Sequence, residues 1–215
     1  MYFDLSVMLC ALSGVIAGAK ILKNGKPLYA QMIVMGMGCM AMGKAYCFAR
    51  QLTDLPMKGI FHVGILGIVG AFGFFFSSNF GQIDSLVDEG GKSFIKYRII
   101  SLSAVAVIAA FYAVILLSSA KTVEKITDAL AAIAIAAACY YHLKHLLIPD
   151  IENGIVKSLR GYNALALAYG VVCMLGIAAS AFELETVYGT ACILQCAVSL
   201  MIVPIMKKGV SKWSK

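Results

Sequence analysis

Apolar residues in this chain occur in long blocks that short polar segments separate. Each block has about 20 residues, the length that an α-helix needs to cross a hydrocarbon layer about 30 Å thick. The pattern predicts an all-α integral membrane protein, a bundle of seven transmembrane helices that forms one polytopic membrane domain over residues 1–215. The predicted spans are 3–22, 29–49, 59–79, 98–118, 126–147, 161–181 and 186–206.

The segments between these blocks carry residues that end and begin helices. Residues 23–27 contain Gly25 and Pro27, and residues 153–154 are Asn-Gly. Both segments are typical of turns. The sixth connection carries only two charges, Glu183 and Glu185. Two carboxylates in the middle of a membrane would be very costly, so we predict a short loop there.

Composition agrees with a membrane protein. The chain is 61% hydrophobic and 13% charged, whereas soluble domains are nearer half apolar and a quarter charged. In a soluble protein the net charge of +7 would indicate nucleic acid. Here the basic residues lie at the ends of the predicted spans. We therefore expect the bilayer, including anionic lipid headgroups, as the partner, and no nucleic acid.

The distribution of lysine and arginine predicts the orientation. Four of these residues lie in the second and fourth connections, and thirteen lie in the first, third and fifth connections and the C-terminal tail. Because basic loops stay on the cytoplasmic side, we predict an outside N-terminus and a cytoplasmic C-terminus in the plasma membrane. The thirteen are Lys20, Lys23, Lys26, Lys92, Lys96, Arg98, Lys144, Lys157, Arg160, Lys207, Lys208, Lys212 and Lys215.

Small residues predict close helix packing. The first span contains Gly14 and Gly18 as G-x-x-x-G, and the third contains a run of glycines from Gly64 to Gly73 at a spacing of three. Small residues let helix backbones approach one another in a membrane. The sequence leaves open whether these faces pack inside one bundle or form a homodimer. The seven cysteines lie within apolar spans without a C-x-x-C pair, so we interpret them as small buried residues.

Lys44 is the charged residue that the loop pattern does not explain. It lies well inside the second span, where an ionisable residue indicates a functional site. His62 lies at the outer end of the third span, at a similar depth, so the two side chains are a candidate outward-facing ligand site. The alternative is that the long lysine side chain extends to the headgroups. Residues considered as neighbours are Asp4, Tyr46, Asp54, Glu183 and Glu185.

A second group of polar residues is predicted on the cytoplasmic side. Four span ends bring hydroxyl, amide, imidazole and carboxylate groups to one depth, which is consistent either with anchoring at the headgroups or with a cavity open to the cytoplasm. The candidate ligand-binding residues are Asn79, Asp84, Tyr141, His142, His145, Arg160 and Asn163.

The sequence does not identify a reaction. His142 and His145 are three residues apart and, with Asp84 or Asp150, contain zinc-type ligands, but there is no H-E-x-x-H motif, so no metal site is assigned. A G-x-S-x-G turn for a nucleophilic serine is also missing. Microbial rhodopsins hold retinal on a lysine of the last span, and residues 186–206 contain none. Catalytic residues and cofactors therefore stay unassigned.

Three functions remain as hypotheses. The first is a small transporter or permease-like subunit with a small-molecule ligand, because almost the whole chain is membrane-spanning and carries intramembrane polar residues. The second is a membrane-embedded enzyme that acts on a lipid or lipid-linked substrate from the cytoplasmic side. The third is a receptor-like or assembly subunit without an output domain of its own.

Overall fold

The computed structural model describes residues 2–23, 27–53, 55, 61–80, 83–84, 88, 91–149 and 155–213. Within these ranges the regular structure is helical, and seven helices are long and apolar enough to cross a membrane. The predicted all-α, seven-helix membrane architecture is confirmed. The helices are α1 (Tyr2–Lys23), α2 (Leu28–Leu52), α3 (Val63–Phe80), α5 (Ile95–Leu116), α6 (Thr122–Leu147), α7 (Ile155–Ala181) and α8 (Glu185–Trp213), and a short 3-10 helix, η1 (Lys92–Phe94), precedes α5.

Most helix ends lie close to the predicted span ends, but α7 begins at Ile155, six residues before the predicted start at 161. The connection between α7 and α8 is the predicted short loop, in which Glu183 adopts a left-handed conformation with φ of 59°. At the C-terminus α8 continues to Trp213, beyond the predicted end at 206. The extension contains lysines, and a helix that leaves the apolar layer can continue through the headgroups without cost to its backbone hydrogen bonds.

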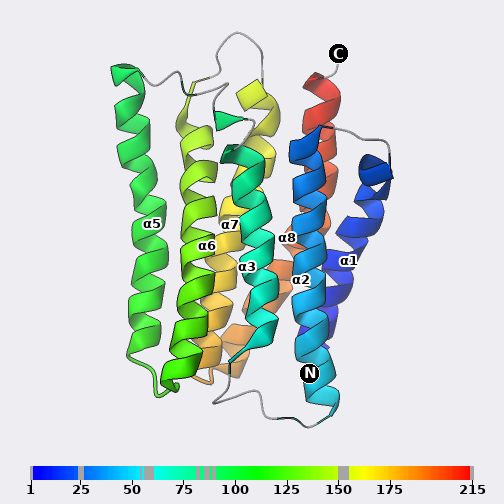
Figure 1. Cartoon of the computed structure of the whole chain (residues 1–215), viewed down its shortest axis with the longest axis vertical. Coiled ribbons are helices and arrows are strands. Elements are labelled where there is room, and N and C mark those ends of the chain that lie inside the picture. Colours follow the sequence, from blue (N-terminus) through cyan, green and yellow to red (C-terminus); the bar gives the residue numbers. More distant parts are fainter. Residues whose placement is uncertain are drawn as a thin grey trace.

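Six of the helices form a closed ring. Along the ring α1 packs on α2, α2 on α3, α3 on α6, α6 on α7, α7 on α8, and α8 again on α1. The helices run side by side, and the two termini lie at opposite ends of the bundle (Figure 1). We refer below to the N-terminal end and the C-terminal end of the bundle. Which end faces the cytoplasm is a prediction from the charge distribution.

α5 lies outside this ring and packs mainly on α6 and α7. Its buried residues are Ser101, Ala104, Ile108 and Ile115, which share one helix face. The rest of the helix exposes apolar side chains such as Leu102 and Val107, as expected for a surface in contact with lipid.

Three glycines bring α2 and α3 into backbone contact. A Cβ atom on Gly67 would lie 2.5 Å from Gly43 Cα, and one on Gly43 would lie 2.5 Å from Gly64 O. Gly14 and Gly18 likewise face side chains of neighbouring helices in the same chain. These small faces thus pack inside the bundle, and a homodimer through the glycine-rich helices stays a prediction.

Candidate functional site

Polar side chains gather at both ends of the bundle. At the N-terminal end, Asp4 on α1 lies at the centre of the Lys44 cluster, which we define as Asp4, Lys44, Gln51 and Tyr188. Asp4 Oδ1 accepts hydrogen bonds from Lys44 Nζ and Tyr188 Oη, both at 2.8 Å, and Oδ2 accepts one from Gln51 Nε2 at 2.9 Å. The cluster therefore joins α1, α2 and α8.

The Lys44 cluster is buried and its carboxylate is well satisfied. Asp4 is 2% exposed and Lys44 is 8% exposed, so the lysine does not extend to the headgroups. The sequence placed Asp4 among several neighbours of Lys44 but missed Gln51 and Tyr188. Gln51 lies seven residues after Lys44 and so shares its helix face, a signal that was available.

The structure describes the surroundings of two other residues that were considered near Lys44. His62 is half-buried, and its Nδ1 atom has no hydrogen-bond partner among the described residues. Burial, followed by the positive charge of Lys44, lowers the pKa of His62. Tyr46 instead accepts a hydrogen bond of 3.4 Å from Arg50. Asp54 lies outside the described residues.

At the C-terminal end three helices bring together the His142 cluster, which consists of Asn79, His142 and Asn163. Asn79 lies near the end of α3, His142 near the end of α6, and Asn163 near the beginning of α7. Each of the three is 0% exposed. His142 Nδ1 lies 2.7 Å from Asn79 Nδ2 and 2.9 Å from Asn163 Oδ1, and Asn79 Nδ2 lies 3.0 Å from the same oxygen.

These three contacts cannot all be hydrogen bonds. An amide nitrogen donates, an amide oxygen accepts, and Nδ1 does one or the other depending on the tautomer. Among three mutually contacting atoms at least two must be of the same kind, so one contact always joins two donors or two acceptors. Rotating an amide or protonating the ring moves the conflict to another side of the triangle without removing it.

The outward-facing atoms of the His142 cluster also lack partners among the described residues. Asn79 Oδ1, His142 Nε2 and Asn163 Nδ2 are buried without a hydrogen bond in this part of the chain. Nearby, the ring of Tyr162 packs edge-on against His142 at 5.4 Å between centroids, and its hydroxyl lies 3.2 Å from Ser78 Oγ. Three such atoms in one cluster are unusual, because most buried polar atoms in proteins are hydrogen-bonded.

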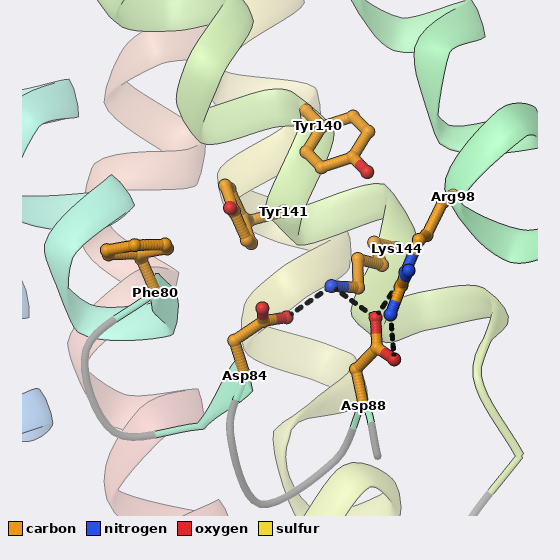
Figure 2. A pocket seen from close by; sticks show the side chains of 7 residues that line it. All are labelled: Phe80, Asp84, Asp88, Arg98, Tyr140, Tyr141 and Lys144. Carbon is orange, nitrogen blue, oxygen red and sulfur yellow. Dashed lines mark hydrogen bonds and ion pairs between the residues drawn. The ribbon is translucent and has the colours of Figure 1, made fainter. Parts of the chain in front are cut away.

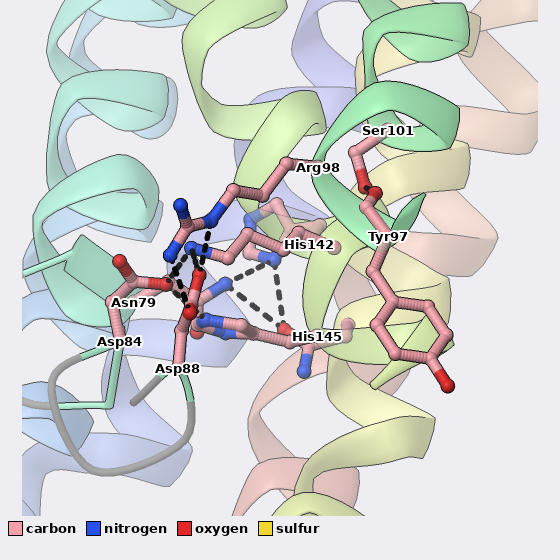
Figure 3. A network of polar contacts seen from close by, with 10 residues as sticks. Asn79, Asp84, Asp88, Tyr97, Arg98, Ser101, His142 and His145 are labelled. Atoms are coloured by element: carbon pink, nitrogen blue, oxygen red, sulfur yellow. Dashed lines mark hydrogen bonds and ion pairs between the residues drawn. The ribbon is translucent and has the colours of Figure 1, made fainter. Parts of the chain in front are cut away.

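Next to the His142 cluster lies the Lys144 network, which consists of Asp84, Asp88, Arg98, Lys144 and His145 (Figure 3). Lys144 Nζ bridges Asp84 Oδ1 at 2.6 Å and Asp88 Oδ2 at 2.7 Å. Arg98 on α5 holds both oxygens of Asp88, at 2.6 and 2.8 Å. His145 Nε2 lies 3.0 Å from Asp84 Oδ1. Two acidic side chains that follow α3 are thus fastened to α5 and α6.

The charges of the Lys144 network determine the state of Asp84. Burial is the largest influence and by itself would raise the pKa of this carboxyl group. Hydrogen bonds from His145 and Lys144, with the charge of Lys144, outweigh it and hold the pKa of Asp84 below its usual value. Asp84 is therefore a carboxylate at neutral pH.

An open pocket of about 430 Å³ lies against this network. Figure 2 shows Lys144 between the two aspartates, with Tyr140 and Tyr141 on one side. Tyr141 packs edge-on against Phe76 and Phe80, and Lys144 Nζ lies 5.3 Å from its ring centroid. The lining residues are Phe80, Asp84, Asp88, Arg98, Tyr140, Tyr141 and Lys144.

Most of the residues that the sequence assigned to this end lie together. Asn79, His142 and Asn163 form one cluster, and Asp84, Tyr141 and His145 lie in or beside the Lys144 network. Arg160 is exposed, and within the described part of the chain no contact joins it to either group. The sequence missed Lys144, which it treated as a headgroup-facing residue although it is 4% exposed.

The geometry offers little for metal or nucleophilic chemistry. Among the described residues no group of three or more His, Cys, Asp and Glu side chains is placed to hold a metal ion. Ser78 Oγ donates to the carbonyl of Phe75 at 2.7 Å and contacts Tyr162, and no contact with an imidazole is found among those residues.

Comparison of the chain with known protein families, with curated proteins and with solved structures gave no match. The seven long apolar helices indicate a multi-pass membrane protein.

Proposed function

We propose that this protein is a small transporter or permease-like subunit that binds a small polar solute at the His142 cluster. The observation that carries the proposal is the set of three fully buried polar side chains whose mutual contacts conflict and whose outer atoms have no partner. In an apolar bundle such groups are costly, which favours a functional reason for their presence.

The cluster indicates the kind of solute. The two hydrogens on Asn79 Nδ2 reach His142 Nδ1 and Asn163 Oδ1, which favours the tautomer with a hydrogen on His142 Nε2. The cluster then presents two donors, His142 Nε2–H and the Asn163 amide, and one acceptor, Asn79 Oδ1. A solute with at least two acceptor atoms and one donor satisfies all three and removes their desolvation penalty.

The surroundings favour entry from the C-terminal end. His145 lies one helical turn beyond His142 and belongs to the Lys144 network, which borders the open pocket. By the distribution of basic residues this end faces the cytoplasm. Fusion of a reporter that fluoresces only in the cytoplasm to the C-terminus tests this orientation, and fluorescence is the expected result.

The Lys44 cluster is less suited to hold a solute. Asp4 already accepts three hydrogen bonds, and its ion pair with Lys44 leaves no net charge to attract a ligand. We therefore assign the Lys44 cluster a structural role. An enzymatic function is supported less well, because the described residues show no nucleophile beside either histidine.

Thermal unfolding of the purified protein with a panel of amino acids, carboxylates, sugars and nucleosides tests the proposal. A solute at a hundred times its Kd stabilises the folded state by about 2.7 kcal/mol. We expect Asn163→Ala to abolish the shift that the best solute produces. The matched control is Gln195→Ala, which removes a buried amide on α8 and leaves the shift intact. Equal shifts in wild type and Asn163→Ala would contradict the proposal.

A further inference from the structure

Two basic side chains share one oxygen atom in the Lys144 network. Lys144 Nζ lies 2.6 Å and His145 Nε2 lies 3.0 Å from Asp84 Oδ1. Because Asp84 is a carboxylate, the short distance places a hydrogen on His145 Nε2, which donates to that oxygen. In the neutral ring the second nitrogen, Nδ1, then carries a lone pair.

This second nitrogen is a buried base that has no partner among the described residues. His145 is 1% exposed, and its Nδ1 makes no hydrogen bond in that part of the chain. A histidine that donates from one ring nitrogen to a carboxylate can accept a proton on the other, because both nitrogens carry a hydrogen in the imidazolium. A proton that binds at Nδ1 forms an imidazolium whose Nε2–H already lies against the negative charge of Asp84.

Among the described residues, the charged and titratable groups around His145 come from three elements. Asp84 and Asp88 follow α3, Arg98 comes from α5, and Lys144 and His142 lie on α6 with His145. On α7, Tyr162 and Asn163 contact His142 and are uncharged at neutral pH. Two negative and two positive charges balance in this network, so a proton on His145 adds one net positive charge.

We infer that His145 is a proton-binding site that couples proton uptake to solute binding at the His142 cluster. The coupling rests on the proposed function, whereas proton binding stands on the geometry alone. The step is a reversible proton transfer from a hydronium ion to Nδ1. One N–H bond forms as one O–H bond of the hydronium ion breaks, which leaves a water molecule, and no electrons are exchanged.

Proton binding alters both neighbours of His145. The imidazolium competes with Lys144 for Asp84 Oδ1, and Lys144 keeps its other contact, with Asp88 Oδ2 at 2.7 Å. The new positive charge lies one turn from His142, on the same helix face. It favours electron-rich groups against the two donors of the His142 cluster, so the preferred solute is anionic or rich in acceptor atoms. By linkage, such a solute and the proton promote each other's binding.

Histidine-labelled protein in detergent micelles tests the proton site, because ring ¹⁵N shifts report the protonation of each nitrogen. The chain has three histidines, His62, His142 and His145, and a His62→Gln variant assigns the first. Between pH 8 and pH 5 we expect one ring to gain a proton at Nδ1 while its Nε2 stays protonated. In Asp84→Asn the protonated fraction of that ring at pH 6 falls about fivefold or more, which identifies it as His145.

The outcomes separate this inference from the proposed function. If no ring gains a proton at Nδ1 down to pH 5, or if the ring that does so titrates equally in wild type and in Asp84→Asn, the proton site is overturned. The thermal shift by a solute at the His142 cluster would then stand or fall by its own test. If His145 titrates but the solute shift is the same at pH 6 and pH 8, the coupling is overturned and the proton site stands.

Discussion

Lys44 on α2 and Asp4 on α1 form an ion pair of 2.8 Å across 40 residues of sequence, and both side chains are buried. The pair fastens the first two helices of the ring, and Tyr188 brings α8 to the same carboxylate. Three helices are thus held by one buried charge.

Removal of Lys44 leaves that charge without its counter-ion. We expect Lys44→Met to lower the free energy of unfolding by about 3–5 kcal/mol, measured by detergent-induced unfolding in mixed micelles. Adding Asp4→Asn to this variant removes the unpaired charge and recovers part of the loss. Solute shifts at the His142 cluster persist in both variants. A Lys44→Met protein as stable as wild type would rule out this role.

The contact between α2 and α3 depends on glycines, which have no side chain to keep the two backbones apart. Gly67→Ala places a Cβ atom 2.5 Å from Gly43 Cα, and backbone atoms cannot rotate away. The helices must separate, at a cost of about 1–3 kcal/mol of unfolding free energy. Gly73→Ala on the same helix is the control, because nothing lies within 4 Å of its added Cβ. Equal stability of the two variants would show that the backbones of α2 and α3 are farther apart at Gly67 than in this structure.

A substitution in the turn between α7 and α8 is expected to stabilise the protein. Glu183 has a φ of 59°, a conformation that costs a residue with a side chain about 1–2 kcal/mol relative to glycine. Glu183→Gly is therefore expected to raise the unfolding temperature. Glu185→Gly, at the first residue of α8, lowers it because an acidic side chain in the first turn stabilises the positive end of the helix dipole. A lower unfolding temperature in Glu183→Gly would indicate that contacts of the glutamate outweigh its backbone strain.

His62 makes stability depend on pH. The pKa of His62 is lower in the folded protein than in the unfolded chain. Its contribution to the unfolding free energy is therefore complete above the unfolded pKa of about 6.5. That contribution is lost as the pH falls below the unfolded pKa, toward the lower pKa of the folded protein. We expect the unfolding free energy of the wild type to fall more steeply between pH 7.5 and 5.5 than that of His62→Gln. Parallel pH profiles would show that burial does not disfavour the charged ring.

The spans were predictable because a membrane helix needs only length and hydropathy, which each segment shows by itself. The grouping of polar residues at the C-terminal end of the bundle was predictable in part. Asn79, His142 and Asn163 lie at the ends of their spans, so an up-and-down topology brings them to one depth. Their mutual contact depends on the ring order of α3, α6 and α7, which hydropathy does not encode.

The role of Lys144 could not be read from the sequence. A lysine near the end of a span usually faces the headgroups, and only the positions of Asp84 and Asp88 relative to α6 reveal that it bridges two carboxylates. Tyr188 was missed for the same reason, since its partner Asp4 lies 184 residues away. Its neighbours Cys192, Gln195 and Ser199 lie on the same face of α8 and are buried, which is a pattern that could have identified that face as inward.

The ring closes where α8 returns to α1, and this sets the order in which the chain can assemble. α1 and α2 leave the ribosome first and can bring Asp4 and Lys44 together as a hairpin, so that neither charge enters the lipid alone. The opposite flank of α1 must wait until α8 has been synthesised. Until then it is covered by lipid or by the insertion machinery, and a chain that stops before α8 has an open seam along its first helix.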